Sequence, residues 1–95
     1  MTDDRILTLH PSGKKGVNIR LDRYEFLKNY ILATVKTASE ITFSDLGDKA
    51  VEEISSRFDG KVLWYITTVK LDLEARKLIE RIPQISPQKL RLSTI

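Results

Sequence analysis

Sulfur and imidazole ligands are almost missing from this chain. It has no cysteine and a single histidine, His10. Without cysteine the chain can form no disulfide, thiolate metal site or cysteine nucleophile, and one imidazole builds a metal cluster only with several carboxylates. No nucleophile–base pair is visible either. We therefore expect a protein that is not an enzyme, needs no cofactor or metal, and has no small-molecule ligand.

Long apolar stretches are missing as well. No run approaches the roughly 20 apolar residues that a membrane-spanning helix needs. The first residues, MTDDR, are acidic, whereas a signal peptide begins with a basic stretch followed by an apolar one. We therefore expect no contact with a membrane and a cytoplasmic location, which the lack of cysteine also fits.

The charge that is present is distributed unevenly. A chain of 95 residues supports one domain with a single core, residues 1–95. Residues 1–21 carry four basic and two acidic side chains, residues 22–58 five and seven, and residues 59–95 seven and four. The basic C-terminal third suits contact with a polyanion, although an excess this small is also common on solvated surfaces.

The first 21 residues predict a hairpin extension. Residues 5–10, RILTLH, and 17–20 are typical of two short strands, and PSGKKG between them has the proline and glycines of a loop. Lys14 and Lys15 lie at its tip. The segment GKKG lacks the spacing and the following Ser or Thr of a nucleotide-binding loop. Two interpretations remain: a basic loop that touches a nucleic-acid backbone, or a solvated turn.

Residues 22–38 predict the first helix. Asp22 and Glu25 have the spacing of a capping box at its start. Residues that recur at helical spacing form its core stripe: Tyr24, Leu27, Ile31, Val35 and Ala38. A second strip, formed by Phe26, Tyr30 and Ala33, needs a cover because adjoining exposed aromatics are unusual on a monomer. We expect the N-terminal hairpin to cover it, with a dimer partner as the alternative.

The second helix is predicted to have Ser44 as its N-cap, after a strand-like stretch Ile41–Phe43, and to run to about Phe58. Its apolar face comprises Leu46, Ala50, Val51, Ile54 and Phe58. The opposite face is acidic and comprises Asp45, Asp48, Glu52 and Glu53, with Lys49 as its one cation. A phosphate backbone would repel this face, so we expect it to point away from any nucleic acid.

The third helix, predicted over Val62–Arg76, is apolar on two opposite sides and should be the most buried helix. One stripe comprises Val62, Ile66, Val69 and Leu73, and the other Trp64, Leu71 and Ala75. Two polar strips lie between the stripes. One comprises Thr67, Lys70, Glu74 and Lys77, and the other Thr68, Asp72 and Arg76.

Two short strands are predicted after the third helix, over Leu78–Ile82 and Lys89–Thr94. They alternate apolar and polar residues on either side of the proline-containing stretch PQISPQ. The inward-facing residues of the last strand are Leu90 and Leu92, and the outward-facing ones are Lys89 and Arg91. The sequence therefore predicts a basic C-terminal hairpin.

The segments WYITTVKLDLEARKLIERI and QKLRLST are similar to the recognition helix and wing of winged helix-turn-helix proteins. Together with LHPSGKKGV, the whole chain resembles a family of small uncharacterised bacterial proteins that consist of little more than this domain. The resemblance implies an α+β winged helix-turn-helix over residues 22–95, with Val62–Arg76 as the recognition helix and Ile79–Thr94 as the wing. Many winged helices have a glycine where this chain has Lys77. Either Lys77 takes a left-handed conformation or the helix ends differently, which leaves the orientation of the wing open.

The resemblance favours binding of duplex DNA, as in a transcriptional regulator. The residues that would contact DNA are Lys61, Thr67 and Lys70 on the third helix, Lys89 and Arg91 on the C-terminal hairpin, and Lys14 and Lys15 in the N-terminal loop. The alternative is a module for protein interaction or homodimerisation without nucleic acid. Its contact surface would be either Phe26 and Tyr30 or the acidic face of the second helix.

Overall fold

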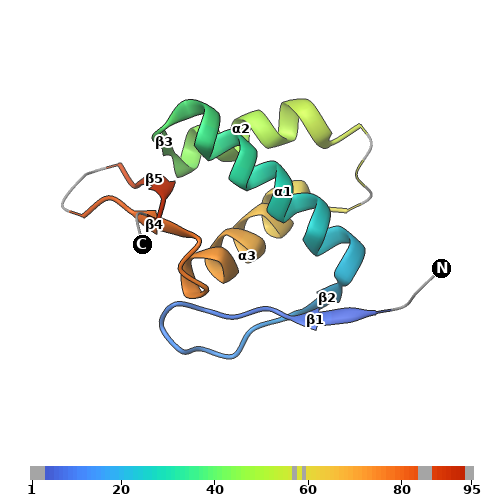
Figure 1. Cartoon of the computed structure of the whole chain (residues 1–95). Coiled ribbons are helices and arrows are strands. Elements are labelled where there is room, and N and C mark those ends of the chain that lie inside the picture. Colours follow the sequence, from blue (N-terminus) through green and yellow to red (C-terminus); the bar gives the residue numbers. More distant parts are fainter. Residues whose placement is uncertain (1–3, 57, 59, 84–86, 94–95) are drawn as a thin grey trace.

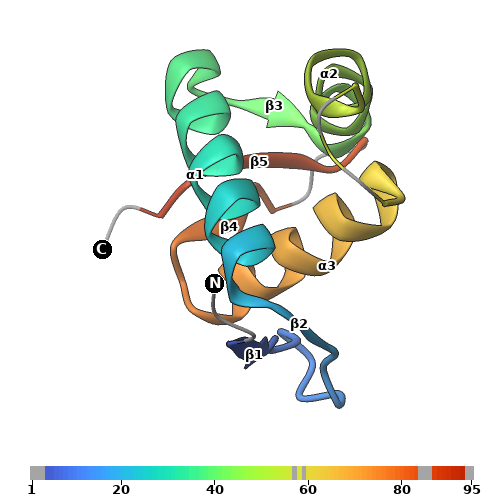
Figure 2. The same cartoon turned by 90° about the vertical axis from the view of Figure 1, so that its right-hand side faces the viewer.

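The chain folds into three helices and two small antiparallel sheets over the residues that the computed structural model describes, 4–56, 58, 60–83 and 87–93. The elements are β1 (Arg5–Leu7), β2 (Asn18–Arg20), α1 (Leu21–Ala38), β3 (Ile41–Thr42), α2 (Phe43–Ile54), α3 (Val62–Ala75), β4 (Ile79–Arg81) and β5 (Lys89–Leu92). The helices pack together, and the two sheets lie on different sides of them (Figure 1, Figure 2). This arrangement confirms the predicted α+β class. Within the described ranges, no helix is long and apolar enough to cross a membrane.

One core collects the apolar stripes of all three helices. The predicted stripe of α1 is buried except for Ala38, which is exposed at the helix end. The other buried helical residues are Leu46, Ala50 and Ile54 of α2 and Val62, Ile66, Val69 and Leu73 of α3. Ile19, Ile79 and Leu90 of the strands complete this core. Helical periodicity therefore identified these inward faces, because one side of each helix must leave water.

The start of α1 differs from the prediction. The helix begins at Leu21, directly after β2, and its N-cap Arg20 makes no side-chain cap. The backbone carbonyl of Asp4 satisfies the first amide of the helix, since it accepts from the Leu21 N–H at 2.8 Å. The Asp22 carboxylate bonds Arg20 and the Arg23 N–H instead. The predicted capping box is wrong, because the chain that precedes β1 already fills the place of a cap.

Both ends of α2 also differ from the prediction. Thr42 rather than Ser44 is the N-cap, and its hydroxyl accepts from the Asp45 N–H at 3.0 Å. The helix ends at Ile54, four residues before Phe58. Phe58 still reaches the core from the connection that follows, where its ring meets that of Tyr65 edge-on at 5.0 Å between centroids. The apolar character of Phe58 was recognised, but tertiary packing rather than a helical turn buries it.

The three-stranded sheet has the order β3-β5-β4, so the strand between α1 and α2 pairs with the last strand of the chain. In the registers, Leu90 pairs with Ile41 and with Arg81, and Leu92 pairs with Ile79. Leu90 is buried, as predicted, and Leu92 packs against the core. Part of the predicted connection, residues 84–86, and Thr94 lie outside the described residues.

The end of α3 answers the question posed by Lys77. This residue takes a φ of 65°, the left-handed conformation that glycine usually supplies. The Lys77 N–H donates to the Glu74 carbonyl at 3.1 Å, and the Leu78 N–H donates to the Leu73 carbonyl at 2.9 Å. These two bonds form a Schellman motif, which satisfies the last carbonyls of the helix. A non-glycine residue in this conformation costs about 1 kcal/mol.

The predicted N-terminal hairpin is present, with β1 and β2 antiparallel. The Thr8 hydroxyl extends the pairing, because it donates to the Val17 carbonyl and accepts from the Val17 N–H, both at 3.0 Å. Gly16 is required beside it: a Cβ there would lie 1.6 Å from the Thr8 carbonyl oxygen. The hairpin is tied to α3 through the Leu9 N–H, which donates to the Asp72 carboxylate at 2.9 Å.

Candidate interaction surfaces

The exposed side of α3 is apolar along its N-terminal half. Leu63 is 54% exposed and Trp64 is 44% exposed. Lys61 is exposed just before the helix. Thr67, which was expected to contact DNA, is half-buried, and its hydroxyl donates to the Leu63 carbonyl at 2.8 Å. The side that a groove-reading helix would present therefore carries an aliphatic and an aromatic side chain.

Lys70 does not lie on an exposed strip. Its side chain is buried, its ammonium lies 2.8 Å from a carboxylate oxygen of Glu74, and it sits 4.9 Å from the centre of the Phe43 ring. Phe43 at the start of α2 covers this part of α3. The expectation that Lys70 is free to contact DNA is wrong in this structure, because that contact would require breaking a buried ion pair.

The two-sided burial predicted for α3 is wrong in its second stripe. Trp64 is exposed, and Leu71 and Ala75 are only half-buried. Of the polar strip with Thr68, Asp72 and Arg76, the first two residues are buried and Arg76 is exposed. The reason is that α1 and the chain of the N-terminal hairpin both meet this side of α3, through the bonds from Tyr24 and Leu9 to Asp72.

Asp72 is a buried hub that joins three parts of the chain. Its carboxylate accepts from the Tyr24 hydroxyl at 2.6 Å, from the Arg76 guanidinium at 2.8 Å and from the Leu9 N–H at 2.9 Å. Burial raises the pKa of the Tyr24 phenol above its ordinary value, and the hydrogen bond to Asp72 adds to this. The hydrogen bond to Asp72 likewise raises the pKa of Arg76. The hub fixes the hairpin, α1 and α3 relative to one another.

A shallow groove of about 430 Å³ lies at the junction of α2 and α3. Its lining residues are Val51, Ser55, Gly60, Lys61, Val62, Leu63 and Trp64. The helices approach closely beside it, since a Cβ on Gly47 would lie 2.9 Å from a methyl group of Leu63. Val51, Leu63 and Trp64 are all at least 40% exposed. We call these three residues the α2–α3 apolar surface.

A run of aromatic rings continues this surface toward α1. The ring centroids of Trp64 and Tyr65 are 5.0 Å apart, those of Tyr65 and Phe58 are 5.0 Å apart, and those of Phe58 and Phe26 are 6.1 Å apart. Arg23 lies over the middle of the run and donates to the Tyr65 hydroxyl at 2.8 Å. Edge-to-face and stacked rings of this kind favour a fixed arrangement.

The N-terminal hairpin does not cover Phe26 and Tyr30, so that expectation is wrong. Phe26 stacks on Phe58, and the Tyr30 hydroxyl donates to the Glu53 carboxylate on α2 at 2.7 Å. Burial and this hydrogen bond raise the pKa of Tyr30 to about 12. The hairpin packs against α3 instead, on the far side from α2. The strip of Phe26 and Tyr30 on α1 is thus covered in part by α2 and by the segment after it, while Phe26 stays 39% exposed.

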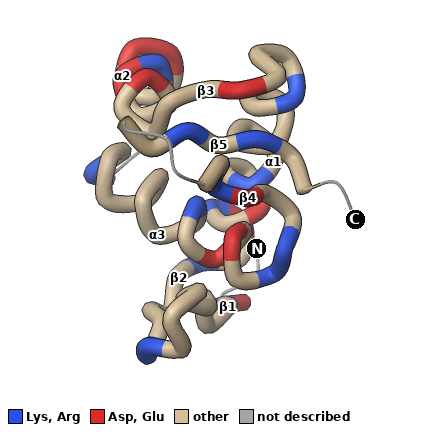
Figure 3. The backbone as a smooth tube through the Cα atoms, turned by 90° about the vertical axis from the view of Figure 1, so that its left-hand side faces the viewer, with Lys and Arg blue, Asp and Glu red and all other residues tan. Residues whose placement is uncertain are grey.

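The remaining predicted DNA contacts are distributed over the other side of the molecule. Arg91 pairs with Glu80 at 2.6 Å, and Lys89 lies 3.9 Å from Glu40. Lys14 and Lys15 are exposed in the N-terminal loop. Figure 3 shows basic segments on β5, near the end of α3 and in that loop, with acidic segments among them. The structure therefore does not bring these residues together with Lys61 into one basic surface.

Residues 5–90 match the sequence model of DUF6958, a family of unknown function. The chain belongs to this family. The DUF6958 match begins with β1 and includes all three helices, so the N-terminal hairpin is part of the sequence that the family shares. Comparison with curated proteins and with solved structures gives no match.

In this DUF6958 chain the α2–α3 apolar surface was missed at the sequence level. Val51 and Trp64 were assigned to core stripes, because apolar residues at helical spacing are usually buried. A signal was present in the third helix, whose apolar residues occupied two opposite sides while the chain had few elements to cover both. Within the described ranges, no three His, Asp or Glu side chains gather as metal ligands.

Proposed function

We propose that this DUF6958 chain is a winged-helix module that pairs with a second copy of itself through the α2–α3 apolar surface. The order of its elements supports the winged-helix assignment: three helices, a short strand between the first two, and a hairpin after the third whose last strand pairs with that short strand. The observation that carries the pairing is the exposure of Leu63 and Trp64 on the outer side of α3.

The composition of α3 favours pairing over groove reading. Between residues 62 and 75 the one cation in the sequence is Lys70, which is buried against Glu74. Reading base edges needs side chains that donate and accept hydrogen bonds in the groove, whereas Leu63 and Trp64 offer apolar area. Tryptophan in particular contributes large apolar contact at protein interfaces.

The charges at the edge of the surface suit a second copy. Lys61 lines the groove, and Asp48 lies one helical turn before Val51 on α2, where it is exposed. In a two-fold dimer the same patch serves both subunits, so each contact occurs twice. Lys61 of one copy can then face Asp48 of the other, which makes this edge self-complementary.

Sedimentation velocity with two matched variants tests the pairing. Leu63 and Leu7 are exposed to 54% and 55%, but Leu7 lies on β1, away from the surface. We expect the wild-type chain and Leu7→Glu to sediment as dimers at about 100 μM, and Leu63→Glu as a monomer, because a carboxylate there would be buried on pairing. A wild-type chain that remains monomeric, or a Leu63→Glu variant that dimerises equally, would contradict the proposal.

A second candidate function is contact with duplex DNA through the side shown in Figure 3. The specific observation is that Lys14 and Lys15 are exposed in one loop and make no ion pair with the described residues. Anisotropy of a labelled mixed-sequence duplex over a salt series measures this binding. Replacing both lysines with Gln should then lower the salt slope by about two. Binding that is absent at low salt, or independent of salt, excludes this function.

A further inference from the structure

The N-terminal hairpin carries a second group of exposed apolar side chains. Leu7 is 55% exposed, Leu9 is 44% exposed and Val17 is 41% exposed. None of the three lines the groove beside the α2–α3 apolar surface. Figure 1 and Figure 2 both show the hairpin on the side of the molecule opposite α2. Pairing through the α2–α3 apolar surface therefore does not account for the exposure of these side chains.

The two leucines lie on one face of the hairpin. Successive side chains of an extended chain point to opposite faces. Along β1 and the two residues after it, Ile6 packs against the core and Thr8 is buried, while Arg5, Leu7 and Leu9 are exposed. This alternation places Arg5, Leu7 and Leu9 together on the outer face, which is turned away from the core.

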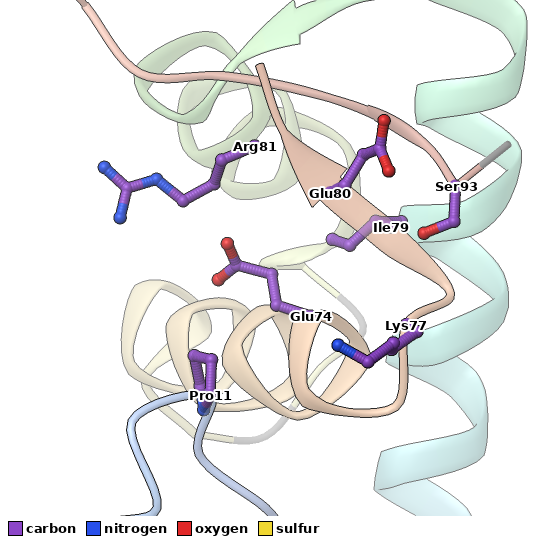
Figure 4. A pocket seen from close by; sticks show the side chains of 7 residues that line it. All are labelled: Pro11, Glu74, Lys77, Ile79, Glu80, Arg81 and Ser93. Atoms are coloured by element: carbon purple, nitrogen blue, oxygen red, sulfur yellow. The ribbon is translucent and has the colours of Figure 1, made fainter. Parts of the chain in front are cut away.

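The inner side of the hairpin is fixed to α3. The Leu9 N–H donates to the buried Asp72 carboxylate at 2.9 Å. Pro11, in the loop, lines a pocket of about 290 Å³ together with Glu74 and Lys77, and Figure 4 shows its ring beside the end of α3. The outer face is therefore held in place before any partner arrives, which lowers the entropy cost of binding.

The charge of the hairpin has one sign. Residues 5–21 contain four cations and no acidic side chain. One of the cations, Arg20, is paired with Asp22 at 2.7 Å. The other three are exposed and make no ion pair with the described residues; they are Arg5, Lys14 and Lys15. Along the chain, positive charge thus precedes and follows the two exposed leucines.

We propose that the outer face of the N-terminal hairpin binds the surface of an anionic lipid membrane. Leu7 and Leu9 enter the boundary between headgroups and acyl chains, and the three unpaired cations bind the lipid phosphates. The leucines favour lipid over duplex DNA, because a phosphate backbone offers no apolar phase to receive them. The expectation of no membrane contact rested on the lack of a spanning stretch and a signal peptide, and peripheral binding needs neither.

Co-sedimentation with lipid vesicles tests this surface. The probes are phosphatidylcholine vesicles with and without phosphatidylserine. We expect saturable binding to the anionic vesicles, with half-saturation at about 0.1–1 mM lipid, and none to the neutral ones. The affinity should fall as salt rises, because the cations contribute to it. Absence of binding to the anionic vesicles at low salt would overturn the proposal.

Two double variants separate the apolar contribution from the charge. Leu7→Ser with Leu9→Ser, and Lys14→Gln with Lys15→Gln, should each weaken binding about tenfold or more. The control Lys36→Gln with Lys49→Gln removes two exposed cations from α1 and α2 and should leave the affinity unchanged. Circular dichroism confirms that each chain is folded.

Two results of this series would overturn the proposal. Equal vesicle affinity of the two-serine variant and the wild type would show that charge alone attracts the chain. Tighter binding to a mixed-sequence duplex than to vesicles, unaffected by the two serines, would assign the hairpin to nucleic acid.

A tryptophan placed in the hairpin reports insertion directly. Trp64→Phe removes the one tryptophan of the chain, and Leu9→Trp then places a single indole on the outer face. We expect its emission maximum to shift to shorter wavelength when anionic vesicles are added, and to stay constant with neutral ones. A chain that sediments with the vesicles while this emission stays unchanged would overturn the proposal, whatever its oligomeric state.

Discussion

The phenol of Tyr24 on α1 donates a 2.6 Å hydrogen bond to the carboxylate of Asp72 on α3, where both side chains are buried. The same carboxylate accepts from Arg76 and from the backbone of Leu9. One side chain thus holds the N-terminal hairpin and two helices together. A substitution of Asp72 would leave these donors without their acceptor, in a place that is buried from water. The fold should therefore be sensitive to any change at this position.

Asp72→Asn should destabilise the chain by about 2–3 kcal/mol, because the amide nitrogen cannot accept and leaves a buried donor unpaired. Tyr24→Phe removes one donor and leaves two, so we expect a smaller loss of about 1–1.5 kcal/mol. The free energy of unfolding in urea measures both. Equal stability of Asp72→Asn and the wild type would show that the hub contributes nothing.

Stability should fall as pH rises above about 10, because two tyrosines have raised pKa values in the fold. In the unfolded chain a tyrosine titrates near pH 10. Burial and Glu53 raise the pKa of Tyr30 to about 12, and burial and Asp72 raise that of Tyr24. Between these pH values the unfolded chain binds fewer protons than the folded one, so stability is complete below pH 10 and is lost toward pH 12.

Thermal unfolding at pH 9, 10 and 11 measures this dependence. The double variant Tyr24→Phe, Tyr30→Phe should lose less stability over this range than the wild type, because neither position can then ionise. An equal loss of stability with rising pH in the variant and the wild type would show that other groups cause the pH dependence.

The buried pair of Lys70 and Glu74 should make single substitutions costly. Lys70→Met leaves the Glu74 carboxylate buried without its cation, which should cost about 3 kcal/mol. Adding Glu74→Gln removes the orphaned charge and should recover most of the loss. A double-mutant cycle in urea gives the coupling energy. If Lys70→Met has no effect, the lysine is not committed to this pair and remains available to a nucleic acid.

Glycine should stabilise the ends of two helices. Lys77 after α3 and Ser39 after α1 have φ values of 65° and 68°. Lys77→Gly and Ser39→Gly should therefore each raise stability by about 0.5–1 kcal/mol, which corresponds to a few degrees in Tm for a chain of this size. Lys36→Gly, inside α1, is the control and should lower stability by about 1 kcal/mol. A lower Tm for Lys77→Gly would mean that its side chain stabilises the fold.

Local patterns predicted much of this fold. The core stripes of the helices and both hairpins follow from apolar spacing and turn residues, which depend on neighbours in the sequence. The left-handed conformation at Lys77 was one of two predicted outcomes, because the position of the helix end limited the choices. The structure confirms the α+β class that these patterns predict.

The exposed surfaces could not be predicted in the same way. Periodicity marked Trp64 as core and Lys70 as exposed, and the structure reverses both. Which side of α3 is covered depends on where the N-terminal hairpin and Phe43 pack, and these are contacts between distant parts of the chain. The capping box at Asp22 failed for the same reason, since the backbone of Asp4 takes the place of the cap.

Tryptophan fluorescence gives the sharpest test of pairing, because Trp64 is the one tryptophan of the chain and lies in the α2–α3 apolar surface. Pairing would move its half-exposed indole out of water. We predict that the emission maximum shifts to shorter wavelength as the concentration rises from about 1 to 500 μM, and that Leu63→Glu shows no shift. An emission maximum that stays constant in the wild type over this range would contradict pairing through this surface.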